Sequence, residues 1–119
     1  MNDASTTITQ IKDAVLAMCR RKGWGDAQGI QNPQHIAMAM TVEMSEVLEH
    51  FQWLNPEDVA ALREGRDPDR VALIAEELAD VLIYGTQLAY GLNIDIAAQI
   101  ERKIGIVDKR PPKSDNPVR

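Results

Sequence analysis

The chain has 119 residues, a length typical of a single domain. Its residues are 45% hydrophobic, which supports a packed core, but no apolar run reaches the length of a membrane-spanning helix. The formal net charge of −5 disfavours tight binding to a nucleic-acid backbone, although it permits a nucleotide that is held through a metal ion. The first ten residues are polar and lack a signal-peptide pattern, so we expect a cytoplasmic protein.

Helical patterns dominate the sequence from its N-terminal end. Apolar residues recur at three- and four-residue steps over about residues 6–22, which predicts a first helix. Gly23 and Gly25 then end the pattern. Cys19 belongs to the apolar face of this helix, so we expect it to be a small buried residue.

The next segment begins with a helix-start signal. Asn32 suits the N-cap, and a proline follows at the first helical position, so a second helix is expected over about residues 33–53. The Asn55-Pro56 pair ends this helix. A short helical piece is expected over residues 56–63.

Two further helices are expected after this piece. Asp67 caps a helix over residues 68–90, and Gly91 is placed to terminate it. This helix is apolar on nearly all sides and must therefore be covered on most of them. Asp95 caps the last helix, over residues 96–108.

Short connections between these helices predict an all-α fold, a four-helix antiparallel bundle formed by residues 1–110. Residues 111–119 contain three prolines, which predicts an extended C-terminal tail. A chain of this length has too few residues to cover the apolar 68–90 helix by itself, so we expect a homo-oligomer. A compact monomer is the alternative.

Two acidic pairs lie within these apolar helices. Glu43 and Glu46 are three residues apart, as are Glu77 and Asp80, so the members of each pair share a helix face. Residues 23–62 and 71–101 contain no Lys or Arg that could offset the four charges.

Carboxylates without basic partners suit a hard divalent cation, which favours Mg²⁺, Mn²⁺ or Ca²⁺ over zinc. The Glu-x-x-His motif of di-iron bundles is absent, because His50 follows Glu49 directly and Glu46 by four residues. The alternative is a solvated acidic face, which would bind a basic partner helix without a metal.

These segments resemble a known family. Residues 36–54, IAMAMTVEMSEVLEHFQWL, resemble the first acidic helix of the MazG-like all-α nucleotide pyrophosphohydrolases, and residues 75–84, AEELADVLIY, resemble the second. Together they match the E-x-x-E and E-x-x-D signature of that family, closest to its dCTP pyrophosphatase branch. The resemblance covers nearly the whole chain.

The resemblance implies Mg²⁺-dependent hydrolysis of nucleoside triphosphates to monophosphate and pyrophosphate, with Mn²⁺ as a substitute. It implies that Glu43, Glu46, Glu77 and Asp80 are metal ligands in the catalytic site, and Glu46 is one candidate for activating the attacking water. It also implies a homodimer or homotetramer and a pyrimidine deoxynucleotide such as dCTP. A dUTP or modified-nucleotide substrate is an alternative within the same fold.

Further site residues are implied by matching position. Trp24 and Trp53 would contact the base, Tyr84 would be a site tyrosine, and Lys103 would reach the phosphates. For each tryptophan, a core or interface anchor is the alternative. Other candidates for phosphate contacts, or for a solvated basic helix end, are Arg102, Lys109 and Arg110. His35 and His50 are expected to be capping or surface residues.

Overall fold

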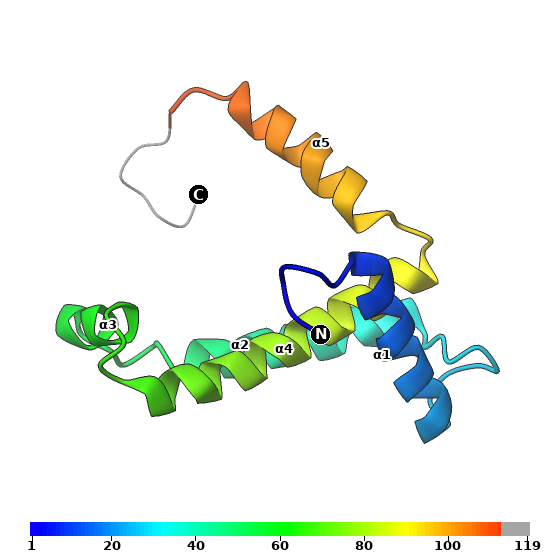
Figure 1. Ribbon diagram of the computed structural model, residues 1–119, viewed down its shortest axis with the longest axis horizontal. Helices are drawn as coiled ribbons and strands as arrows, with labels where there is room; N and C mark the ends of the chain where they lie inside the picture. The colour runs from blue at the N-terminus through cyan, green and yellow to red at the C-terminus, as the bar shows by residue number, and fades with distance from the viewer. Residues whose placement is uncertain (113–119) are drawn as a thin grey trace.

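The computed structural model describes residues 1–112, which form five α-helices and no strand (Figure 1). The all-α class is therefore confirmed. The helices are α1 (Ile8–Lys22), α2 (Pro33–Glu49), α3 (Pro56–Arg63), α4 (Pro68–Gly91) and α5 (Ile96–Asp108). Most of the predicted tail, residues 113–119, lies outside the described residues, so the division between a domain and a tail stays a prediction.

Side-chain caps set the starts of these helices. The side chains of Asn32, Asp67 and Asp95 each accept a hydrogen bond from a backbone N–H in the first turn that follows, as their positions predicted. Thr7 and Asn55 additionally form capping boxes, so the first helix begins at Ile8 rather than near Thr6.

Two helix ends differ from the expectation. The second helix ends at Glu49, with His50 as its C-cap, and a turn follows over residues 51–53. Gly91 is still helical, and the left-handed residue that terminates α4 is Asn93, with φ of 56°. Asparagine tolerates this conformation better than most residues other than glycine.

The core lies where α2, α4 and α1 meet (Figure 1). Helices α2 and α4 are antiparallel neighbours: Gly91 near the end of α4 faces Pro33 at the start of α2, and Gly85 faces Met40. Helix α1 packs across α4. The buried apolar residues come from these three helices, and the fully buried Cys19 confirms its predicted place: Val15, Leu16, Cys19, Ile36, Val47, Val81 and Ala89.

The last helix stands apart from this core. Helix α5 has no buried residue, and Figure 1 shows that the chain turns after α4 and that α5 lies apart from α2 and α4. The connection before it is held by Lys12, whose Nζ donates to the carbonyl oxygen of Ile94 at 2.7 Å. The expected four-helix bundle is therefore not confirmed within one chain. No helix in residues 1–112 is both long and apolar enough to cross a membrane.

Candidate metal centre

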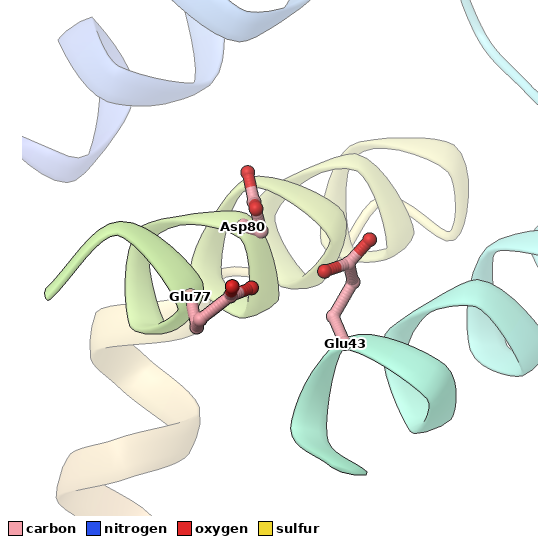
Figure 2. Close-up of side chains that lie close together, drawn as sticks. All are labelled: Glu43, Glu77 and Asp80. Carbon is pink, nitrogen blue, oxygen red and sulfur yellow. The ribbon is translucent and has the colours of Figure 1, made fainter. Parts of the chain in front are cut away.

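Three carboxylates from two helices converge on the α2–α4 interface. Glu43 extends from α2 toward α4, which carries Glu77 and Asp80 (Figure 2). One carboxylate oxygen from each of the three lies within 4.8 Å of the other two. We call Glu43, Glu77 and Asp80 the carboxylate cluster.

Helix periodicity explains why these residues meet. Val47 and Val81 are buried in the seam between α2 and α4. Glu43 precedes Val47 by one helical turn and Glu77 precedes Val81 by one turn, so both glutamates lie on the faces that the two helices turn toward each other. The buried valines thus fix the backbone that carries the carboxylates.

Glu46, the fourth predicted acidic residue, lies beside the cluster. Contact with the Glu46 carboxyl is the largest cause that raises the pKa of Glu77, ahead of burial and the nearby charges of Glu46 and Asp80. The Glu46 carboxyl also raises the pKa of Glu43. The four acidic residues of the two sequence pairs therefore form one neighbourhood, with three of them closest together.

The environment of Glu43 fits a bound cation. Burial is the largest cause that raises the pKa of Glu43 above its ordinary value, and the carboxylates of Glu46, Asp80 and Glu77 add to it. Its Oε2 atom is buried and has no hydrogen-bond partner. A buried carboxylate oxygen without a partner is costly, and an oxygen-preferring divalent ion would satisfy it.

In the described part of the chain, no Lys or Arg forms an ion pair with the carboxylate cluster. The ion pairs there join Arg66 to Glu57 and Glu64, and Arg70 to Asp67, all away from the cluster. His50, expected to be a capping or surface residue, is the C-cap of α2, and its charge lowers the pKa of Glu77. His50 follows Glu46 by four residues, and this helical spacing is the sequence signal that could have placed His50 near the acidic site.

The other predicted site residues lie on different elements of the fold. Tyr84 is half-buried on α4, one turn after Asp80. Trp24 is 46% exposed in the loop that leads to the start of α2, whereas Trp53 is 86% exposed beyond its end. A helix of 17 residues, which spans about 25 Å, separates the loop that holds Trp24 from the turn that holds Trp53 along the chain. Lys103 is exposed on the separate helix α5.

Comparison with known proteins supports the sequence resemblance. The model of the MazG-like family matches residues 38–116. The chain is 31% identical over 87 residues to dCTP pyrophosphatase 1 of Homo sapiens, and this match covers 73% of this chain and 50% of the relative. It is 30% identical over 87 residues to the proteins of the same name from Rattus norvegicus and Mus musculus. These matches also cover 73% of this chain and 50% of each relative. The chain thus spans about half the length of these relatives.

Proposed function

The chain belongs to the MazG-like family, and from this premise we propose that it is a nucleotide pyrophosphohydrolase. The reaction would convert a nucleoside triphosphate and water into a monophosphate and pyrophosphate. The observation that carries the proposal is the carboxylate cluster, because its three side chains converge from two helices and lie within the segment that the family model matches.

Glu43, Glu46, Glu77 and Asp80 are the residues that would hold Mg²⁺, with Mn²⁺ as a substitute. A bound divalent ion supplies positive charge that stabilises the negative charge developing on the attacked phosphoryl group and on the leaving pyrophosphate. The orphaned Oε2 of Glu43 and the all-oxygen donor set support this assignment.

Glu46 is the residue we assign to proton transfer. The attacking water forms a bond to the α-phosphorus while the bond from that phosphorus to the α,β-bridging oxygen breaks. The water must lose a proton, and the electron pair of the broken bond leaves with pyrophosphate. A carboxylate has two oxygens, so Glu46 would hold the metal through one of them and accept that proton at the other.

The proposed substrate is a pyrimidine deoxynucleotide such as dCTP, with dUTP or a modified nucleotide as alternatives. The relatives named dCTP pyrophosphatase 1 support the first choice. Trp24 and Trp53 are proposed as base contacts and Tyr84 as a site residue, and the exposure of both indole rings leaves them free to stack. Lys103 is proposed as a phosphate contact.

We also propose that the chain works as a homodimer or homotetramer. Many large apolar side chains are exposed in the single chain, and exposed apolar surface of this kind marks interfaces between proteins. A second copy would cover α4 and α5, and it would allow tryptophans from two chains to approach one base. The exposed apolar residues of α2, α4 and α5 include Met38, Val42, Leu48, Leu73, Leu78, Leu82, Ile100, Ile104 and Val107.

Self-association can be tested at Leu82, which is 58% exposed on α4. Leu82→Glu is expected to shift the protein to a smaller species in analytical ultracentrifugation, because it places a charge in the proposed interface. Leu82→Met keeps the apolar surface and is expected to behave as the wild type. A wild-type protein that sediments as a monomer at all concentrations would overturn the proposed assembly.

The reaction itself is tested with a panel of NTPs and dNTPs, in Mg²⁺ or in EDTA, with separate assays for pyrophosphate and orthophosphate. We expect Mg²⁺-dependent pyrophosphate release that falls at least about 100-fold in Glu46→Gln. Glu49→Gln, an exposed carboxylate on the same helix, is the matched control and is expected to retain activity. A folded, metal-binding wild type that turns over no triphosphate would refute the proposal and favour a non-enzymatic bundle that binds a basic partner.

A further inference from the structure

The loop between α1 and α2, residues 23–32, is folded tightly around Asp26. The backbone N–H of Asp26 donates to the carbonyl oxygen of Ile30 at 2.9 Å, and the Asp26 carboxylate accepts from the N–H of Ile30 at 2.9 Å. The same carboxylate accepts from the N–H of Gln28 at 2.9 Å. Gly25 lies so close to this pair that a Cβ on it would meet the Ile30 carbonyl oxygen at 2.5 Å. Residues 25–30 therefore form one compact unit.

Trp24 directly precedes this unit and is tied to α1. Its backbone N–H donates to the carbonyl oxygen of Cys19 at 2.9 Å. Gly29 also packs on α1, since a Cβ there would lie 3.0 Å from the carbonyl oxygen of Leu16. The Trp24 side chain nevertheless remains 46% exposed. The backbone around Trp24 is thus fixed while its indole ring stays accessible.

A side-chain hydrogen bond ties the 23–32 loop to α4. The Nε2 atom of Gln31 donates to the Oε1 atom of Gln87 at 2.7 Å. Gln87 is 9% exposed, and among residues 1–112 it is the one buried polar side chain. Burial of a polar side chain is unfavourable unless it is hydrogen-bonded, which favours this contact. The cavity between the loop, α1 and α4 is only about 10 Å³, room for about one water molecule, so the loop is seated closely on the core.

Gln87 lies on the same helix as two members of the carboxylate cluster. It follows Asp80 by seven residues, which is two helical turns, so the two residues lie on one side of α4 about 10 Å apart along the helix. Helix α4 thus carries both proposed metal ligands and the anchor of the loop that presents Trp24.

We infer that Gln87 is a positioning residue, which holds the 23–32 loop on α4 through Gln31 and so fixes Trp24 relative to the carboxylate cluster. This inference rests on the proposed function, since the base contact of Trp24 is part of that proposal. Gln87 touches no substrate group in this role. Holding the loop in place before the nucleotide arrives removes an ordering cost from base binding. Phosphates held at the metal do not depend on this anchor.

Two substitutions remove the anchor from either side. Gln87→Met and Gln31→Met each delete one partner of the hydrogen bond and keep a side chain of similar length, so the second decides the question if the first fails to fold. The double variant should match the worse single variant, because the two side chains act through one contact. Gln34→Met makes the same change at an exposed glutamine near the start of α2 and is the matched control. The full chain is used throughout.

Loop order is measured without substrate, by hydrogen–deuterium exchange of the backbone amides in residues 23–32. We expect exchange at least tenfold faster in Gln87→Met and Gln31→Met, and unchanged exchange in Gln34→Met. Amides in the seam between α2 and α4 report on the whole fold, and they should change less than those of the loop.

Binding is measured by titration calorimetry with two probes in Mn²⁺. One is the α,β-methylene analogue of dCTP, and the other is inorganic tripolyphosphate, which has no base. We expect both anchor variants to bind the analogue at least fivefold more weakly and tripolyphosphate within twofold of the wild type. With the best-hydrolysed triphosphate, KM should rise while kcat stays within about twofold, because the anchor acts on the base and not on the reacting phosphates.

Three results would contradict the inference. Unchanged loop exchange in both anchor variants shows that Gln87 does not hold the loop. Faster exchange with unchanged analogue binding shows that the anchor positions no base contact. Equal loss for the two probes places the effect at the metal ligands or on the whole fold. A wild type that binds the analogue but releases no pyrophosphate refutes the proposed reaction, while exchange and binding still decide the inference. A wild type that binds neither probe overturns both.

Discussion

Replacing Glu43 by glutamine is expected to stabilise the metal-free protein while removing its response to divalent metal. Glu43 is surrounded by like charges from Glu46, Asp80 and Glu77, and its Oε2 atom is buried without a hydrogen-bond partner. Glutamine has nearly the same shape but no charge, and its amide group can donate to the neighbouring carboxylates. The substitution thus removes a repulsion that the folded chain tolerates without metal.

The expected size follows from the number of charged neighbours. Each like-charge pair at helical-neighbour distance costs a few tenths of a kcal/mol of stability. Because Glu43 has three such neighbours, Glu43→Gln should raise the free energy of unfolding by about 1 kcal/mol. For a domain of this length, that change corresponds to a rise in Tm of about 3–6 °C. For the wild type, Mg²⁺ at ten times its Kd adds about 1.4 kcal/mol to the free energy of unfolding. This gain should largely vanish in Glu43→Gln.

The assay is thermal unfolding followed by circular dichroism, in EDTA and in a series of Mg²⁺ concentrations. Glu49→Gln removes one charge from the same helix outside the carboxylate cluster, and we expect it to shift Tm by less than about 2 °C. If Glu43→Gln lowers Tm in EDTA, the carboxylate is compensated in the metal-free protein and the reasoning fails. An equal rise for Glu49→Gln would assign the effect to net charge rather than to the cluster.

Two further predictions concern pH and the loop after α1. Because the pKa values of Glu43 and Glu77 are raised in the folded chain, the stability that these two groups contribute in EDTA should be complete below their ordinary value of 4.5 and be lost as pH rises through the folded pKa values. Stabilisation by Mg²⁺ should grow over the same window, since the metal needs deprotonated ligands, and thermal scans from pH 4 to about 7.5 would check both trends. Gly25→Ala should destabilise by at least about 2 kcal/mol in urea unfolding, because φ is 79° and a Cβ would lie 2.5 Å from the carbonyl oxygen of Ile30. Gly23→Ala has φ of 70° but open space around it, so its cost should stay near the left-handed backbone penalty of about 1 kcal/mol, and equal costs for the two variants would contradict the steric argument.

The local features of this fold could be predicted from the sequence. Cap residues such as Asn32, Asp67 and Asp95 mark helix starts because their side chains bond to backbone groups only two or three residues away. The end of α2 was predicted several residues too late, because the Asn55-Pro56 pair that was used as its stop signal caps the start of α3, and a turn lies between the two helices. A cap signal marks where the next helix starts, and it does not fix where the previous helix stops.

The acidic site was only partly determined by the sequence. The three-residue spacings of its two acidic pairs fix which side chains share a helix face, whatever the tertiary structure. The convergence of Glu43 with Glu77 and Asp80, and the loss of solvent at the Oε2 atom of Glu43, depend on the antiparallel register of α2 and α4. That register is set by packing between residues far apart in the chain, for which no local signal exists.

Tertiary structure also decided the relations among the remaining site residues. Trp24 and Trp53 were both matched to a base-binding role, but they follow different helices and lie beyond opposite ends of α2. His50 was expected to be a capping or surface residue, and the packing of α2 on α4 also puts its charge close enough to lower the pKa of Glu77. The sequence by itself thus determined the helices and the faces that carry the acidic pairs, because these depend on contacts within a few residues. Only the tertiary structure decided which charges meet, because electrostatic and burial energies depend on distances in space rather than along the chain.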